Sequence, residues 1–133
     1  MNVGGISMEG DSNKSPHILL VDDEDFLVKL WKNVLKKHGY KVTGFTQAKL
    51  ALEAFKNYPQ SFDIVVTDQS MPAMSGKELS VELLKIRSDI KIIICTGYLE
   101  DMDRFDNIGM AICEFLLKPF DNDTLLKAIE RNI

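Results

Sequence analysis

Short apolar runs alternate with longer amphipathic segments along the chain from residue 17 onward. The apolar runs are rich in Ile, Val, Leu and Phe and span four to six residues each. Runs of this length and composition predict buried β-strands. The predicted strands cover residues 17–21, 40–45, 63–67, 91–95 and 114–117.

The segments between these runs carry their apolar residues at the spacing of one helix face. In the first segment, Leu27, Leu30 and Trp31 begin an i, i+3, i+4 pattern that continues for one further turn at i+7 and i+8. Before the third segment, Ser75 and Glu78 predict a capping box, in which each side chain bonds the other residue's backbone N–H. The predicted helices cover residues 25–38, 47–57, 76–87, about 99–110 and about 122–132.

Alternating strands and helices predict an α/β fold with a parallel sheet. Parallel strands need crossover connections, and right-handed helical crossovers place helices on both faces of the sheet. Strands as continuously apolar as "IIIC" fit this arrangement, because a parallel sheet is buried on both sides. We expect one three-layer domain over residues 16–133, preceded by a flexible lead-in over residues 1–15 that is in part an artificial addition.

Composition narrows the class of protein further. Of the 133 residues, 45% are hydrophobic, which is enough for a core, and the net charge of −4 argues against direct nucleic-acid binding. No apolar run approaches the roughly 20 residues that span a bilayer, so we expect no membrane contact by this domain. Cys95 and Cys113 both lie in apolar runs without metal-type spacing. We expect both to be buried, reduced thiols, and the protein to be cytoplasmic.

Chemically capable side chains follow four of the five predicted strands. Asp22 and Asp23 follow the first strand, Asp68 the third, Thr96 the fourth and Lys118 the fifth. Each residue alone has an ordinary explanation, since an aspartate after a strand is commonly a helix cap. The carboxyl ends of parallel strands share one edge, however, and ligands of open α/β sheets bind there. The set therefore predicts a functional site.

The charges of this set indicate its ligand. Two carboxylates about 4 Å apart repel by about 4 kcal/mol at an effective dielectric constant of 20. Lys118 supplies one compensating charge, and Mg²⁺, which prefers oxygen ligands and accepts phosphate, would supply two more. Asp68 could then act as the nucleophile of a phosphoryl transfer and become an aspartyl phosphate. The hydroxyl of Thr96 could donate a hydrogen bond to the new phosphoryl oxygens.

Four short strings, "VDDE", "TDQSMPAMSG", "CTGY" and "KPF", stand in an order that resembles the receiver (response-regulator, CheY-like) domain of two-component signalling. The resemblance covers residues 16–133 and is greatest to the receivers of hybrid histidine kinases. It implies a flavodoxin-like sheet of order 2-1-3-4-5 with five helices. It also implies a phosphorelay, in which the phosphohistidine of a histidine kinase or phosphotransfer domain phosphorylates Asp68. Such a domain is not an enzyme with its own substrate, although it assists its own phosphoryl transfer.

The same resemblance implies the ligands of the site. Mg²⁺ would be held by Asp23, Asp68 and the backbone carbonyl of Ser70, with Asp22 assisting through water. Lys118 would pair with the phosphate, and the Lys118–Pro119 peptide bond would be cis.

The resemblance also implies a switch. On phosphorylation the Thr96 hydroxyl would move toward the phosphate, and Phe115 would turn inward, although Phe115 can equally be read as an ordinary core residue. The fourth helix, fifth strand and fifth helix would then dock a partner or a second copy of the chain. Ser70 and Tyr98 would flank the hydrolytic water, and we expect the bulky Tyr98 to slow autodephosphorylation.

Three other functions remain as alternatives to this one. An aspartate-based phosphohydrolase places a second acid two residues after its nucleophile, where this chain has Ser70. A flavin- or nucleotide-binding module needs a phosphate-binding loop after the first strand, where "VDDED" would repel phosphate. The third alternative is a degenerate receiver that serves only as a docking module. The wider context also stays open between a stand-alone regulator and a receiver excised from a hybrid kinase or larger regulator, and the excised domain is favoured.

Overall fold

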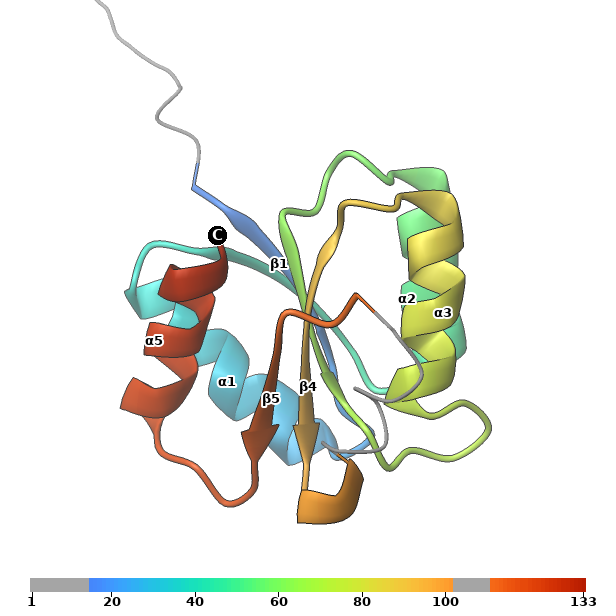
Figure 1. Cartoon of the computed structure of the whole chain (residues 1–133). Coiled ribbons are helices and arrows are strands. Elements are labelled where there is room, and N and C mark those ends of the chain that lie inside the picture. Colours follow the sequence, from blue (N-terminus) through green and yellow to red (C-terminus); the bar gives the residue numbers. More distant parts are fainter. Residues whose placement is uncertain (1–14, 102–110) are drawn as a thin grey trace, which may run out of the picture.

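The computed structural model describes residues 15–101 and 111–133, which form a three-layer α/β/α sandwich (Figure 1). At its centre is a parallel five-stranded sheet in the order β2-β1-β3-β4-β5. The predicted flavodoxin-like order is therefore confirmed, and each predicted strand lies within one residue of an observed one. The strands are β1 (His17–Val21), β2 (Lys41–Phe45), β3 (Ile64–Asp68), β4 (Lys91–Thr96) and β5 (Glu114–Leu117).

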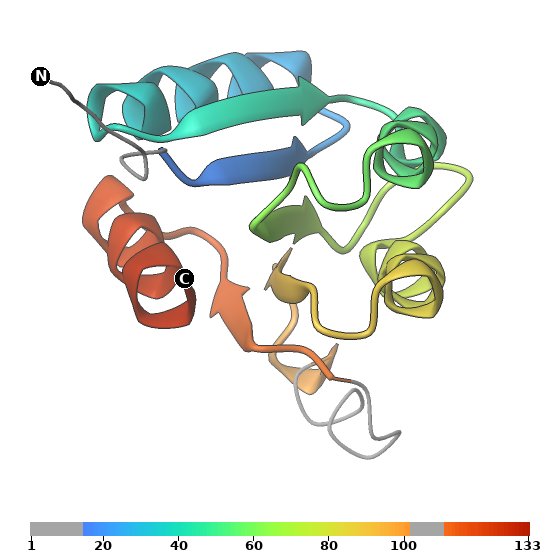
Figure 2. The same ribbon diagram turned by 90° about the horizontal axis from the view of Figure 1, so that it is seen from above.

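Helices cover both faces of the sheet (Figure 2). One face carries α1 (Asp25–Lys37) and α5 (Asn122–Asn132), and the other carries α2 (Ala48–Asn57) and α3 (Gly76–Ile86). Of the helix expected over about 99–110, residues 99–101 are helical, and 102–110 lie outside the described residues. The expected lead-in lies outside them too, apart from Ser15. None of the described helices is long and apolar enough to cross a membrane.

Alternate residues of each strand enter two separate cores. Leu19 of β1 and Val65 of β3 are register partners and pack beneath α2 and α3. Ile18 and Ile64 form the next pair and pack beneath α1 and α5. All four side chains are fully buried. Close packing on both faces restricts the motion of β1 and β3. The backbone at their carboxyl ends is therefore also held in place.

The loop between β3 and α3 is closed by the predicted capping box. The Ser75 hydroxyl accepts a hydrogen bond from the Glu78 backbone N–H at 3.1 Å, and the Glu78 carboxylate accepts one from the Ser75 N–H at 2.9 Å. Two otherwise unpaired N–H groups of the helix terminus are thereby satisfied. The box fixes where α3 begins, and so limits the path of the chain from Asp68 to the helix.

The prediction for the two cysteines is correct for one and wrong for the other. Cys95 in β4 is buried, and burial raises the pKa of its thiol to about 12. Cys113 is exposed. It precedes β5, the strand at the edge of the sheet, and its neighbour Ile112 packs against the core in its place. Successive side chains of an extended segment point to opposite sides, so Cys113 faces outward.

Gly76 brings the start of α3 into direct contact with the end of β3. A Cβ atom at this position would lie 2.4 Å from the backbone oxygen of Asp68 and 3.0 Å from the Cα of Gln69. The Gly76 N–H donates to the Gln69 carbonyl at 3.0 Å. The lack of a side chain at this position therefore allows α3 to pack closely against the strand end that carries Asp68.

We expect Gly76→Ala to destabilise the fold by about 2 kcal/mol, because the new methyl group must displace backbone atoms. Gly97→Ala is the matched control, since a Cβ atom there would meet nothing within 4 Å. Its effect should stay within about 0.5 kcal/mol. Urea unfolding of both variants measures the difference. Equal stabilities would show that the close approach at Gly76 is unimportant.

Candidate functional site

Three aspartates meet at the carboxyl edge of the sheet. Asp22 and Asp23 follow β1, and Asp68 is the last residue of β3. One carboxylate oxygen of each residue lies within 4.8 Å of the others. Asp22 and Asp68 are buried, whereas Asp23 is exposed. The strand order explains the meeting, because β1 and β3 are neighbours and both end at this edge.

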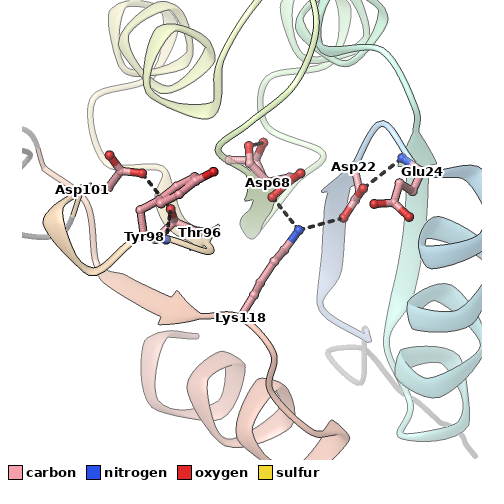
Figure 3. A network of polar contacts seen from close by, with 8 residues as sticks. Asp22, Glu24, Asp68, Thr96, Tyr98, Asp101 and Lys118 are labelled. Carbon is pink, nitrogen blue, oxygen red and sulfur yellow. Dashed lines mark hydrogen bonds and ion pairs between the residues drawn. The ribbon is translucent and has the colours of Figure 1, made fainter.

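Lys118 reaches this cluster from the end of β5 (Figure 3). Its Nζ lies 2.7 Å from Asp68 Oδ1 and 3.8 Å from Asp22 Oδ2. The Lys118 backbone N–H donates to the Thr96 carbonyl at 2.7 Å, which ties the residue to the end of β4. The Lys118–Pro119 peptide bond is cis, as expected.

Burial and neighbouring charges both shift the pKa values of these groups. Burial raises the pKa of Asp68, as does the Asp23 charge, and the hydrogen bond from Lys118 only partly opposes this. Burial and the Asp68 charge likewise raise the pKa of Asp22. Burial acts to lower the pKa of Lys118, but its interactions with Asp68 and Asp22 outweigh it, and the pKa is raised. One ammonium thus faces two buried carboxylates, beside which Asp23 adds a third negative charge.

Asp22 also has a local structural role. Its Oδ1 accepts a hydrogen bond from the Glu24 backbone N–H at 2.9 Å, where α1 begins. This bond lowers the pKa of Asp22, although less than burial raises it. The N-cap residue of α1 is Glu24, which makes no side-chain capping hydrogen bond, so the ordinary explanation of a helix cap is wrong for Asp22, one of whose oxygens instead bonds the turn that precedes α1. The other oxygen faces Lys118.

The donor set fits a hard divalent cation. All three side chains offer carboxylate oxygens, which Mg²⁺ and Ca²⁺ prefer over nitrogen and sulfur ligands. A divalent ion here would relieve the repulsion among the carboxylates and oppose the effect of burial on their pKa values. The oxygen ligands and the excess of negative charge together identify this edge of the sheet as a candidate metal centre.

Thr96 lies at the same edge, but its hydroxyl is hydrogen-bonded on the side away from Asp22 and Asp68. Its hydroxyl donates to Asp101 Oδ2 at 2.7 Å and accepts from the Tyr98 backbone N–H at 3.2 Å. The sequence had given no reason to select Asp101, whose only signal was an acidic side chain in the first turn after β4.

The remaining predicted residues lie around the cluster. Ser70 and Tyr98 line an open cleft beside Asp68, together with Gln69, Glu100 and Asp101. Phe115 in β5 is half-buried and packs against the core beneath α2 and α3. Phe115 is the register partner of Ile94, two residues before Thr96, so Phe115 and Thr96 share one face of the sheet.

A hollow of about 630 Å³ lies at the opposite end of the sheet, far from these groups. Its most deeply placed polar side chains already serve the fold. Arg87 donates to the carbonyls of Pro59 and Phe62 at 2.6 and 2.7 Å. The His17 ring is hydrogen-bonded to Thr43 at 2.7 Å. The polar side chains of this hollow therefore hold loops to the starts of strands. The candidate functional site is the carboxyl edge of the sheet.

Comparison with known proteins points to one family. Residues 18–130 match the model of the family described as "Response regulator receiver domain". The chain is 31% identical over 115 residues to the chemotaxis protein CheY of Thermotoga maritima, a match that covers 86% of this chain and 94% of that protein.

Solved structures agree with the sequence matches. A response regulator receiver domain from Clostridium thermocellum superposes with a TM-score of 0.82 at 30% identity, covering 89% of this chain and 94% of the other. The response regulator protein TrrA of Thermotoga maritima, in complex with Mg²⁺ and BeF, superposes with a TM-score of 0.77 at 32% identity. That match covers 89% of this chain and 99% of TrrA.

The excess negative charge predicts that Asp22→Asn stabilises the metal-free protein. Asparagine keeps the oxygen that accepts from Glu24 but removes a buried charge facing Asp68. In EDTA at pH 7.5 we expect the free energy of unfolding to rise by about 1 kcal/mol. Adding Mg²⁺ should then stabilise the wild type more than the variant, because binding to the folded state adds to stability.

Asp25→Asn provides the control for this measurement. It removes the same charge from an exposed residue, which pairs with Lys29 on the surface, so its effect should be small. Lower stability of Asp22→Asn in EDTA, or an effect no larger than that of Asp25→Asn, would contradict the electrostatic account.

Proposed function

The chain belongs to the family of response regulator receiver domains, and from this premise we propose that it accepts a phosphoryl group on Asp68. The donor is the phosphohistidine of a histidine kinase or of a phosphotransfer domain. The observation that carries the proposal is the placement of Asp68. It is a buried carboxylate at a rigid strand end, with an ammonium 2.7 Å away and two further carboxylates beside it.

The proposed transfer uses the groups of this edge directly. A carboxylate oxygen of Asp68 attacks the phosphorus atom, the bond from phosphorus to the histidine nitrogen breaks, and the imidazole leaves and takes a proton. Lys118 neutralises charge on the phosphoryl oxygens, since its Nζ is already within hydrogen-bonding distance of the Asp68 carboxylate. The domain does not turn over a separate substrate; it assists its own phosphorylation and dephosphorylation.

We assign the metal site to Asp23, Asp68 and the backbone carbonyl of Ser70, with Asp22 acting through water. The cluster of carboxylate oxygens supports this assignment for the three aspartates. The position of Ser70 in the loop after β3 supports its carbonyl as a further ligand. When bound, Mg²⁺ supplies positive charge to the phosphoryl oxygens. The Mg²⁺ and BeF bound by TrrA, a relative of matching fold, are consistent with this ion.

The proposed conformational response begins at Thr96. Its hydroxyl turns toward Asp68 and donates to a phosphoryl oxygen there. Phe115 then turns inward into the space that the hydroxyl has left. The shared face of these two residues supports their coupling. The surface formed by residues 99–110, β5 and α5 then controls a partner or forms a homodimer, although 102–110 lie outside the described residues. A shift between two existing conformations is sufficient for such a response.

The proposal extends to the setting of the domain. We infer a cytoplasmic location, where free thiols such as those of Cys95 and Cys113 stay reduced. We further infer that the chain is the receiver of a hybrid histidine kinase or larger regulator, on the similarity of its "TDQSMPAMSG" and "CTGY" segments to such receivers.

Phosphorylation is tested by intact mass. Incubation with Mg²⁺ and acetyl phosphate should add one phosphoryl group, and the adduct should be absent in Asp68→Asn or in EDTA. A histidine kinase or a phosphorylated phosphotransfer domain should give the same adduct faster. If neither donor gives an adduct and beryllofluoride with Mg²⁺ does not bind, the alternative of a phosphorylation-independent docking module replaces this function.

The lifetime of the phosphoryl group is predicted to depend on Tyr98. The ring is 62% exposed and points toward Asp68 (Figure 3), where it narrows the approach of water. We expect Tyr98→Ala to accelerate the loss of phosphate several-fold, measured by intact mass after removal of the donor. The backbone N–H that bonds Thr96 is kept in this variant. Leu99→Ala, a similarly exposed neighbour, is the control. A rate equal to that of the wild type would disprove the role of Tyr98.

A further inference from the structure

The Thr96 hydroxyl has a buried carboxylate as its partner. Thr96 and Asp101 are 1% and 7% exposed, and the distance from Thr96 Oγ1 to Asp101 Oδ2 is 2.7 Å. A hydroxyl has a single proton to donate. While that proton is shared with Asp101, it is not available to any acceptor on Asp68. A hydrogen bond to a carboxylate is also stronger than one to a neutral oxygen.

The surrounding backbone limits how Thr96 can change partners. The Thr96 carbonyl accepts a hydrogen bond from the Lys118 N–H at 2.7 Å, and Thr96 is the register partner of Leu117 in β5. On the other side of the hydroxyl, the Asp101 N–H donates to the Tyr98 carbonyl at 3.2 Å, which positions Asp101. In Figure 3, Asp101 and Asp68 lie on opposite sides of Thr96. Rotation of the Thr96 side chain between staggered rotamers is the simplest motion that exchanges one acceptor for the other.

We propose that Asp101 is a positioning residue that retains the Thr96 hydroxyl and competes for it with the phosphoryl group on Asp68. This inference rests on the proposed phosphorylation of Asp68. The retained hydroxyl makes the phosphoryl-binding arrangement a minor one in the unphosphorylated protein. The apparent affinity of the site for a phosphoryl group is reduced by the fraction of molecules in that arrangement. Asp101 therefore sets the threshold of the switch without touching the reacting atoms.

Beryllofluoride with Mg²⁺, a mimic of the bound phosphoryl group, tests the inference by calorimetric titration. In Asp101→Asn the acceptor becomes neutral, so we expect the mimic to bind roughly three- to tenfold more tightly. Thr96→Val removes the donor and keeps the branched shape of the side chain. The gain from Asp101→Asn should disappear in the Thr96→Val background, because no hydroxyl is left to compete for.

Glu100→Gln is the matched control for charge. Glu100 directly precedes Asp101 in the chain and lines the same cleft beside Asp68. Its neutralisation therefore measures the general effect of removing a negative charge beside an anionic ligand. A purely structural role of Asp101 would weaken binding, not strengthen it. Urea unfolding checks the folding of each variant, and Asp101→Ser removes the carboxylate independently should the asparagine variant fail to fold.

Tighter binding by Asp101→Asn than by Glu100→Gln, lost in the Thr96→Val background, supports the inference. It is overturned if the variant binds more weakly, if it gains no more than Glu100→Gln, or if the gain persists without the Thr96 hydroxyl. Failure of the wild type itself to bind the mimic with Mg²⁺ overturns the proposed function and this inference together. Binding by the wild type without a gain in the variant overturns only the role of Asp101.

Discussion

The repulsion among three clustered carboxylates, two of which face a single ammonium, is the interaction on which the rest of this structure depends. Burial raises the pKa values of Asp22 and Asp68, and Lys118 compensates only part of their charge. A small domain has only some 5–15 kcal/mol of net stability with which to hold such a cluster. The sheet can do so because β1 and β3 are packed on both faces. The same excess of negative charge is what a bound divalent cation would relieve.

Lys118 links the charged cluster to the ends of two further strands at the same edge of the sheet. Lys118 bonds Asp68 through its side chain and Thr96 through its backbone, so the ends of β3, β4 and β5 are linked by one residue. On the other side of Asp68, Gly76 and the capping box hold the start of α3 close to β3. The backbone around Asp68 is therefore constrained on both sides. The proposed switch therefore requires side-chain rotations at Thr96 and Phe115 and no displacement of this backbone.

Most of the fold and most of the site could be predicted from the sequence for a common reason. A parallel sheet demands continuous apolar strands, and its topology brings strand ends to one edge, so Asp22, Asp68 and Lys118 could be placed together without coordinates. Cys113 was misjudged because side-chain direction beside an edge strand depends on where the strand begins. Asp101 was missed because its contact with Thr96 crosses a turn, and no periodic pattern specifies the geometry of a turn.

A buried hydroxyl that must change partners needs a partner in each state. Leaving a buried donor without an acceptor costs about 1–3 kcal/mol, which would keep Thr96 turned toward any acceptor within reach. If Asp68 were the only acceptor nearby, the hydroxyl would face it with or without phosphate, and no signal would follow. A second acceptor makes the two states comparable in free energy, so that phosphorylation can shift their populations. In the proposed switch the Asp101 carboxylate, 2.7 Å from the hydroxyl, is this second acceptor, and its charge favours the arrangement in which the hydroxyl is turned toward Asp101.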